Sequence, residues 1–233
     1  MNNRLIGNAI VGQSGGPTAA INATLAGVIK GALESSSVKT VYGMRNGIEG
    51  MLEERIIDLG SVFSDPKKLD ALIHTPAAAL GSCRRKLPDP ASESEKDVAL
   101  YERIFDIFQK YDIRYFFYIG GNDSMDTVAK ISKYAEKKSY DIRIMGVPKT
   151  IDNDLVATDH TPGFGSAAKF VSTVMTEIVR DCAVYTTRAV TIVEVMGRDA
   201  GWLTASAGVG RALGIECPDL VYLPERFFSM DEF

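Results

Sequence analysis

Apolar runs rich in β-branched residues alternate along this chain with segments whose apolar residues recur every three or four positions. The first pattern is typical of β-strands and the second of helices. Strands are predicted over residues 4–12, 38–44, 114–120, 141–147, 189–197 and 219–223. Helices are predicted over residues 18–35, 98–111, 124–138, 166–182 and 201–213. The stretch from 57 to 95 is less regular.

This alternation predicts an α/β fold in three layers, a parallel β-sheet with helices on both faces. A change in composition near Pro148 suggests two domains, 1–147 and 148–233. Ligands of such sheets bind beyond the carboxyl ends of the strands. Four motifs lie at predicted strand ends: GQSGGP (12–17), GGNDS (120–124), PKTIDND (148–154) and MGR (196–198). We therefore expect them to serve one site.

Composition then narrows the class of protein. The 233 residues are 45% hydrophobic and 24% charged, which is ordinary for a soluble globular protein. A net charge of −4 without a long basic run argues against a nucleic-acid partner. The N-terminal apolar segment is too short for a membrane span and lacks a signal-peptide layout, so we expect no membrane partner. Three widely spaced cysteines, Cys83, Cys182 and Cys217, predict neither a disulfide framework nor a zinc site, which fits a cytoplasmic protein.

The GQSGGP motif has three interpretations. Glycines between a strand and a helix let backbone N–H groups approach an anion, which suits a phosphate. The same letters match the G-x-S-x-G elbow of serine hydrolases, with Ser14 as nucleophile, although the two histidines, His74 and His160, are not in obvious positions to serve it. A tight turn without a ligand is the third.

GGNDS and PKTIDND carry the carboxylates of the expected site. Asp123 or Ser124 is either a helix N-cap or, for Asp123, a ligand of Mg²⁺, which prefers one or two carboxylates together with phosphate oxygens. Asn153 is expected to form a turn. A carboxylate at Asp152 or Asp154 that deprotonates an alcohol, beside the cation Lys149, is an arrangement suited to phosphoryl transfer.

Other polar residues at strand ends are ambiguous from the residues alone. Arg198 either binds a phosphate through two N–H groups of its guanidinium or forms a structural ion pair. Arg84 and Arg85 either bind an anion or are solvated. Glu225 either accepts hydrogen bonds from sugar hydroxyls or begins a loop.

Taken in order, GQSGGPTAAINA, GSCRR, GGNDS, PKTIDND, VEVMGR and LPE resemble the motifs of the phosphofructokinases, from about Ile6 to the C-terminus. The resemblance implies a phosphofructokinase-like fold with a donor-binding N-terminal domain and the start of a second, sugar-phosphate-binding domain. It implies Asp152 as the general base for the 1-hydroxyl of fructose 6-phosphate, with Lys149, Arg198 and Thr150 completing the catalytic group. Donor contacts are implied for Gly15, Gly16, Arg84, Asp123 and Ser124. Contacts to the sugar phosphate are implied for Thr150, Asp152, Asp154, Met196, Gly197, Arg198 and Glu225.

Two positions bear on the phosphoryl donor. ATP-dependent members of the family generally have glycine where this chain has Asp123 and Lys149. The added bulk and charge resemble the pyrophosphate-dependent members, so the resemblance implies reversible transfer from pyrophosphate to fructose 6-phosphate, a step of glycolysis, with Mg²⁺ as cofactor. Asn122 replaces the usual metal-binding aspartate, which leaves the metal to Asp123 together with Asn122. Near VEVMGR, Arg188 lies one position away from the arginine of ATP-dependent members.

Three alternatives remain open. One is an ATP-dependent phosphofructokinase. Another is a non-catalytic, phosphate-binding fragment, because the chain ends soon after LPE while family members continue. The third is the serine hydrolase described above. An early end is also expected to expose apolar surface that a partner or a homo-oligomer would cover.

Overall fold

The computed structural model describes residues 5–212, 214–215, 218–231 and 233. The chain forms two compact units, Met1–Lys149 (unit 1) and Thr150–Phe233 (unit 2), so the division falls close to Pro148. Among the described residues, no helix is both long and apolar enough to cross a lipid bilayer. Cys83 and Cys182 are free thiols, and Cys217 lies outside the described residues.

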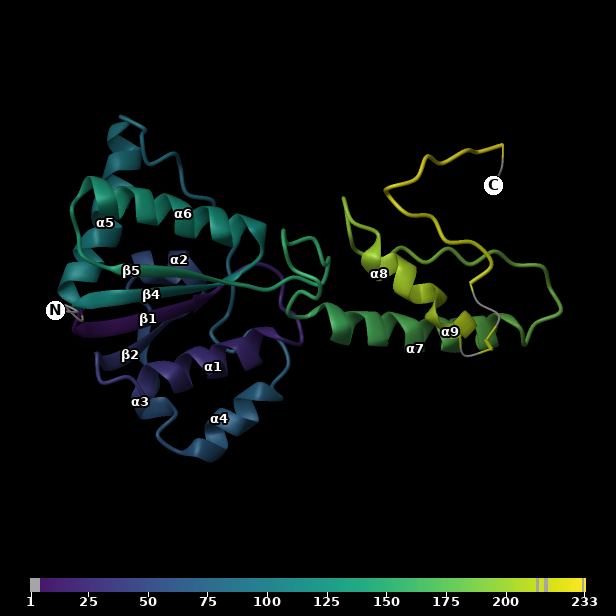
Figure 1. Ribbon diagram of the computed structural model, residues 1–233, viewed down its shortest axis with the longest axis horizontal. Coiled ribbons are helices and arrows are strands. Elements are labelled where there is room, and N and C mark those ends of the chain that lie inside the picture. The colour runs from purple at the N-terminus through teal and green to yellow at the C-terminus, as the bar shows by residue number, and fades with distance from the viewer. Residues whose placement is uncertain (1–4, 213, 216–217, 232) are drawn as a thin grey trace. The chain divides into compact units, whose positions relative to one another are not determined.

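Unit 1 is built on a five-stranded sheet with the strand order β3-β2-β1-β4-β5 (Figure 1). The strands are β1 (Gly7–Gln13), β2 (Val38–Met44), β3 (Ile56–Asp58), β4 (Ile113–Gly120) and β5 (Arg143–Pro148). Strand β1 is parallel to both β2 and β4, and β4 is parallel to β5. The short edge strand β3, which the sequence pattern did not predict, runs antiparallel to β2. The sheet is therefore mixed rather than wholly parallel.

Helices cover both faces of this sheet, as the sequence predicts (Figure 1). They are α1 (Ile21–Leu33), α2 (Gly47–Leu52), α3 (Leu59–Val62), α4 (Pro66–Ile73), α5 (Glu95–Lys110) and α6 (Asn122–Lys137). Alternate residues of β1 point to opposite faces. Ile10 packs in a core with residues of α2, α5 and α6, whereas Ala9 and Val11 pack in a second core with residues of α1, α3 and α4. This period of two explains why the strands are apolar on both sides.

The register of the sheet brings three of the four motifs together at the carboxyl ends of its strands. Gln13, at the end of β1, pairs with Ile119 of β4, and Gly120 of β4 pairs with Pro148 of β5. Because these strands are parallel, the segments that follow them leave the same side of the sheet. The chain also reverses its direction of winding here, since β2 lies on one side of β1 and β4 on the other. This is the position at which open α/β sheets bind their ligands.

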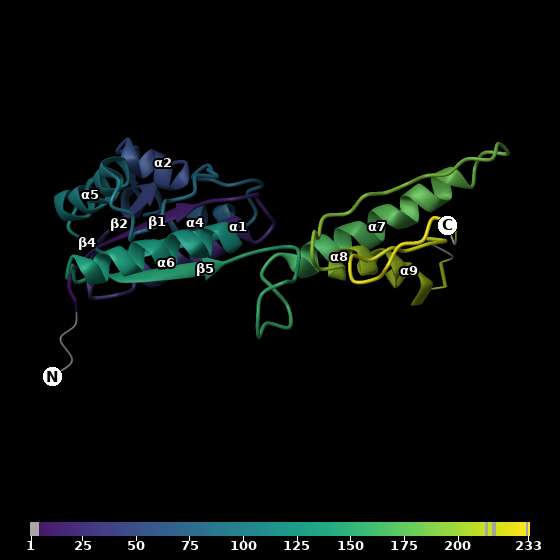
Figure 2. The same cartoon turned by 90° about the horizontal axis from the view of Figure 1, so that it is seen from above.

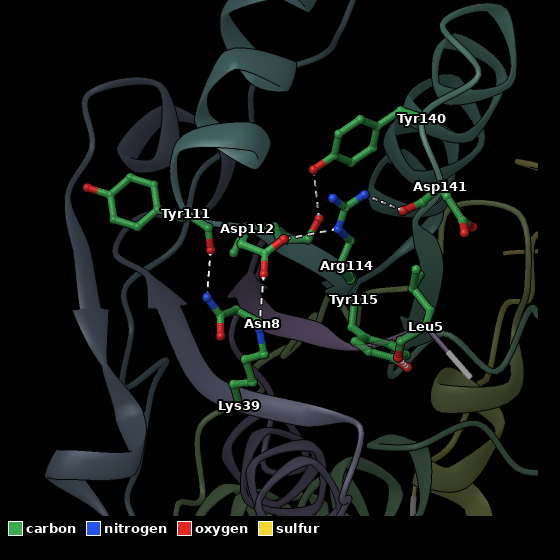
Figure 3. Close-up of polar contacts among 10 residues, drawn as sticks. Leu5, Asn8, Lys39, Tyr111, Asp112, Arg114, Tyr115, Tyr140 and Asp141 are labelled. Carbon is green, nitrogen blue, oxygen red and sulfur yellow. Dashed lines mark hydrogen bonds and ion pairs between the residues drawn. The ribbon is translucent and has the colours of Figure 1, made fainter. Parts of the chain in front are cut away.

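The opposite, amino-terminal edge of the sheet is occupied by structural contacts (Figure 3). The side-chain amide of Asn8 donates to the carbonyl of Tyr111 at 2.7 Å. Arg114 donates to the carboxylate of Asp112 at 3.1 Å and to the carbonyl of Asp141 at 3.1 Å. These bonds tie the start of β1 to the segment before β4, and β4 to the segment before β5.

Unit 2 is organised around the helix α7 (Phe164–Cys182). The short helices α8 (Trp202–Ala205), η1 (Ser206–Gly208) and α9 (Val209–Ala212) take the place of the single helix predicted over 201–213. The hydroxyl of Ser172, in α7, donates to the carbonyl of Ser206 at 2.7 Å, and Leu203 is buried. These contacts attach the short helices to α7.

The strands predicted over 189–197 and 219–223 are not formed, and both predictions are wrong for this chain. After α7 the chain returns along the helix in an irregular, extended path (Figures 1 and 2). In the described part of unit 2 the β-type pairing is a single bridge between Thr150 and Gly163. A strand needs a neighbour for its N–H and C=O groups, and here Val190 and Ile192 are 83% and 81% exposed. The β-branched residues of this segment favour a β-strand, but the described residues of unit 2 offer no neighbouring strand to pair with it.

Candidate functional site

The GQSGGP segment forms a tight turn after β1. The N–H of Ser14 donates to the carbonyl of Ile119 at 2.9 Å, and the N–H of Gly15 donates to the carbonyl of Cys83 at 3.1 Å. Gly15 has a φ of +74°, which favours glycine. The side chain of Ser14 is buried, whereas Gly15 and Gly16 are partly exposed. The N–H groups of Ser14 and Gly15 are therefore engaged within the protein, while both glycines stay partly exposed at its surface.

Ser14 supports this turn rather than serving as a nucleophile. Its hydroxyl lies 2.5 Å from the hydroxyl of Ser124 and donates to the carbonyl of Ile119 at 3.3 Å. Neither of these partners is a histidine, which the hydrolase hypothesis requires. A methyl group on Gly120 would lie 1.9 Å from Oγ of Ser124 and 2.6 Å from Oγ of Ser14, so glycine is needed there.

The GGNDS segment opens α6 two residues earlier than predicted. Gly121 is the N-cap, and no side chain caps this helix. The N-cap interpretation of Asp123 and Ser124 is therefore wrong. Asp123 lies in the first turn of α6 with an exposed carboxylate, where the helix dipole favours negative charge. Ser124 is buried under the glycine turn.

Lys149 reaches the glycine turn from the end of β5. Its N–H donates to the carbonyl of Gly120 at 2.9 Å, and its ammonium donates to the carbonyl of Gly16. The residue is only 4% exposed. A methyl group on Gly15 would lie 3.6 Å from the ammonium nitrogen. The structure thus places a buried cation directly behind the two glycines.

The loop that carries Arg84 lies on another side of the same turn. One guanidinium nitrogen of Arg84 is 3.8 Å from the position of a methyl group on Gly16. Arg84, Arg85 and Lys86 are exposed, and the ammonium of Lys86 lies 3.0 Å from the carboxylate of Asp123. Sequence reasoning named the two arginines and missed Lys86, although the run RRK was the available signal.

A second buried network, also missed, fixes the entry to α1. The side-chain amide of Gln13 donates to the carboxamide oxygen of Asn22 at 2.9 Å and accepts from the N–H of Leu80 at 2.8 Å. Asn22 in turn donates to the carbonyls of Thr75 and Ala77, both at 2.8 Å. This network holds the segment before the Arg84 loop against the start of α1.

Unit 2 begins with TIDND, which forms a defined loop. Asn153 has a φ of +58° and is buried; its side chain accepts from the N–H of Thr161 at 2.8 Å and donates to the carbonyl of Asp159 at 3.1 Å. The predicted turn role of Asn153 is confirmed. Thr150 accepts from the N–H of Asp152 at 3.1 Å. Asp152 is partly buried and Asp154 exposed, so the two carboxylates have different surroundings.

The MGR and LPE motifs lie in the irregular part of unit 2. Gly197 has a φ of +130°. Arg198 is exposed and pairs with its neighbour Asp199 at 3.4 Å. The carboxylate of Glu225 accepts from the N–H of Gly201 at 2.7 Å. Met196 lines an apolar cavity of about 270 Å³ together with Ile151, Phe170, Val174, Met175, Val193 and Leu203. This cavity brings VEVMGR next to the TIDND loop within unit 2.

The described residues contain no group of three or more His, Cys, Asp or Glu side chains that would hold a metal ion by themselves. The sequence-predicted ligand Asp123 offers one exposed carboxylate in the first turn of α6, directly after β4. That donor set suits Mg²⁺, which usually keeps several waters and binds through one or two carboxylates plus phosphate oxygens.

Comparison with known proteins agrees with this organisation. A pyrophosphate–fructose 6-phosphate 1-phosphotransferase from Xanthomonas campestris is 45% identical over 229 residues, covering 97% of this chain and 53% of that protein. The crystal structure of a pyrophosphate-dependent phosphofructokinase from Nitrosospira multiformis matches with a TM-score of 0.86 and 41% identity, over 97% of this chain and 55% of the other. An ATP-dependent 6-phosphofructokinase from Bacteroides thetaiotaomicron is 31% identical, over 91% of this chain and 57% of that protein.

The chain spans about half the length of the curated relatives it matches. The model of the phosphofructokinase family matches residues 8–233. With the glycine turn, the Arg84 loop and the TIDND loop all inside the matched region, the chain belongs to the phosphofructokinase family.

Proposed function

We propose that the protein transfers a phosphoryl group from pyrophosphate to C1 of fructose 6-phosphate, reversibly, giving fructose 1,6-bisphosphate. The observation that carries the proposal is Lys149, a buried ammonium that contacts the glycine turn at Gly16. In ATP-dependent relatives this position generally belongs to glycine. A fixed cation at this place favours the compact, highly charged diphosphate and occupies space that a nucleotide would need.

The donor would be bound by groups of unit 1. The backbone of Gly15 and Gly16, the guanidinium of Arg84 and the ammonium of Lys149 surround one small region at the carboxyl ends of β1, β4 and β5. Fixed dipoles and cations stabilise the charge on a transferring phosphoryl group. Magnesium, held by Asp123 with Asn122 beside it and by phosphate oxygens, would neutralise part of the negative charge of the donor.

The acceptor would be bound by groups of unit 2. Asp152 removes the proton from the 1-hydroxyl of the sugar, and that oxygen forms a bond to one phosphorus of pyrophosphate. The bond from this phosphorus to the bridging oxygen breaks, and inorganic phosphate leaves. The bond from the N–H of Asp152 to Thr150 supports a fixed position for the base. Arg198, Met196, Gly197, Asp154 and Glu225 are proposed to bind the sugar phosphate and its hydroxyls.

Parallel assays of the purified chain test the donor. Fructose 6-phosphate and Mg²⁺ are supplied with either pyrophosphate or ATP, and fructose 1,6-bisphosphate is measured. We expect product from pyrophosphate and little from ATP. Product from ATP alone would replace this proposal by the ATP-dependent alternative.

Two variants test whether the side chains of Asp123 and Lys149 determine which phosphoryl donor is used. The double replacement Asp123→Gly and Lys149→Gly is expected to raise the use of ATP relative to pyrophosphate, because it opens space and removes the buried cation. Lys149→Met is the matched control: it removes the charge but keeps most of the volume, so it should weaken pyrophosphate use without admitting ATP. An unchanged donor preference in the double variant would refute this account.

A second candidate is a polypeptide that binds phosphate without turning it over. It is favoured by unit 2, where Arg198 is 92% exposed at its side chain and the apolar run around Val190 is uncovered. Isothermal calorimetry that detects pyrophosphate binding, together with an absence of product under the same conditions, would establish this candidate.

A further inference from the structure

We propose that Lys86 is an additional donor-binding residue, which pairs with Asp123 in the resting chain and contacts the phosphate oxygens when the donor binds. This inference rests on the proposed pyrophosphate function and adds a residue that neither the motifs nor the family resemblance identified. It concerns the loop 82–88, which we call the basic loop, with Arg84, Arg85 and Lys86 at its centre.

The basic loop is anchored to the core of unit 1 at both ends. Cys83 and Leu87 are buried in the core formed with α5 and α6. The ammonium of Lys130 donates to the carbonyl of Leu87 at 2.9 Å, and the hydroxyl of Tyr101 donates to the carbonyl of Pro88 at 2.7 Å. Between these anchors the three cations are exposed. The loop therefore presents three positive charges on a short, restrained segment.

This segment is also bonded to the glycine turn itself. The carbonyl of Cys83 accepts from the N–H of Gly15 at 3.1 Å, and the hydroxyl of Ser82 donates to the carbonyl of Gly15 at 2.5 Å. The basic loop and the turn therefore keep a fixed relation to each other. An anion bound at Gly15 and Gly16 lies next to the basic loop.

The contact between Lys86 and Asp123 places the tip of Lys86 at the first turn of α6. This turn follows β4 immediately, beside the end of β1. The ammonium-to-carboxylate distance is 3.0 Å, but the two side chains are 70% and 77% exposed. An ion pair so exposed contributes little to stability, so exchanging its carboxylate for a diphosphate has a small cost. A buried pair would be costly to separate.

The exchange has a further consequence for Asp123. Without Lys86, the carboxylate of Asp123 would repel an incoming diphosphate, since both are negative. With Lys86 paired to it, the approach surface carries less net negative charge. Once the donor is bound, Lys86 neutralises phosphate charge and Asp123 is available to the metal.

The test measures pyrophosphate binding by isothermal calorimetry in the presence of EDTA, so that no metal and no turnover contribute. Lys86→Met is compared with Arg85→Met, which removes the same charge from the next position of the same loop. We expect Lys86→Met to weaken pyrophosphate binding about tenfold, the scale of one charge-assisted hydrogen bond, and Arg85→Met to weaken it about twofold. Equal effects of the two replacements would overturn the role of Lys86, because general electrostatic attraction would then explain both.

A double-mutant cycle separates direct contact with the donor from support through Asp123. If Lys86 contacts the donor, Lys86→Met still weakens pyrophosphate binding when Asp123 is already Asn, because a phosphate contact is lost; if Lys86 acts only by screening Asp123, its replacement has no effect in that background. An absent effect of Lys86→Met in the Asp123→Asn chain would overturn direct contact. If the parent chain binds pyrophosphate and Lys86→Met binds it equally well, only this inference fails. If the parent chain binds no pyrophosphate, the proposed donor fails as well.

Discussion

Unit 1 and unit 2 have similar sequence patterns but reach different degrees of order. The four strands predicted in unit 1 all form, and each lies beside another strand. In unit 2 the run around Val190 and Ile192 is at least as rich in β-branched residues as the strands of unit 1, yet it is exposed and irregular. An apolar, β-branched pattern therefore favours a strand, but the strand forms only where a neighbouring strand pairs with its backbone N–H and C=O groups.

Hydrogen exchange should give the largest difference between the two units. Amides in the middle of β1 and β4 are bonded to neighbouring strands, so they should exchange only on extensive unfolding of unit 1. Amides of 189–197 should exchange at least about 10³-fold faster, because they need no such opening. The measurement is exchange followed by mass spectrometry at peptide resolution.

The helix α7 is the internal control for that measurement. Its amides are bonded within the helix, so they should show protection between the two extremes. Protection of 189–197 equal to that of β4 would contradict the comparison and would indicate that this segment pairs in solution.

A loss of turnover of about 10² or more is expected for Asp152→Ser, the usual scale for a positioned base. Pyrophosphate binding, assigned to unit 1, should be unchanged in this variant. The assay is fructose 1,6-bisphosphate formation, with calorimetry of pyrophosphate in parallel. Asp159→Asn is the control, because Asp159 is an exposed carboxylate close by in the same loop region and should be replaceable within about twofold.

Two results would count against this assignment. Near-normal turnover of Asp152→Ser would remove Asp152 from the role of base. Loss of pyrophosphate binding in the same variant would show that the donor and acceptor functions are not divided between the units as proposed.

Gly120→Ala should destabilise unit 1 by about 2–3 kcal/mol, because the new methyl group overlaps Oγ of Ser124 and Ser14 in a packed interior. Gly27→Ala is the matched control. Its methyl group meets no atom within 4 Å, and it lies inside α1, where alanine is the better helix former by about 1 kcal/mol. Urea unfolding of both variants measures the difference.

The sign of the control matters to the interpretation. Gly27→Ala should leave stability unchanged or raise it, whereas Gly120→Ala should lower it. A neutral Gly120→Ala would mean that Ser14 and Ser124 move apart without cost, and that their 2.5 Å contact is not required to hold the glycine turn.

Four of the five strands of unit 1 were predicted because each is a mostly apolar run of at least six residues. Sequence reasoning missed β3, whose three residues are too few for a pattern, and with it the antiparallel edge. It placed the glycine turn, Asp123 and Lys149 at one sheet edge because parallel strands share their carboxyl ends.

Side-chain contacts were harder to predict than positions. That Lys149 is buried with its ammonium on Gly16, and that Lys86 meets Asp123, depends on how three separate loops pack. The run RRK was the available signal for Lys86, but a charged run usually indicates solvated surface and does not by itself show which of its residues has a partner. Asn153 was predictable because its turn conformation is a local property of Asn.

The smallest effect concerns surface ion pairs, where the units again differ. In unit 1 the carboxylate of Glu54 accepts from Arg103 at 2.7 Å, from Lys110 and from the hydroxyl of Tyr111 at 3.1 Å. Lys110 first, and then Arg103, lower the pKa of Glu54 from 4.5 to about 2. In unit 2 the pair of Arg198 and Asp199 joins adjacent, exposed residues.

Glu54→Gln should lower the free energy of unfolding slightly at pH 7, and Asp199→Asn should leave it unchanged. Because the pKa of Glu54 is lower in the folded state, its stabilisation is complete above pH 4.5 and is lost as the pH falls towards 2. The stability difference between Glu54→Gln and the parent should therefore narrow across this window, and also at high salt. A difference that is the same at pH 7 and near pH 2 would show that Glu54 stabilises unit 1 through shape and neutral hydrogen bonds instead of charge.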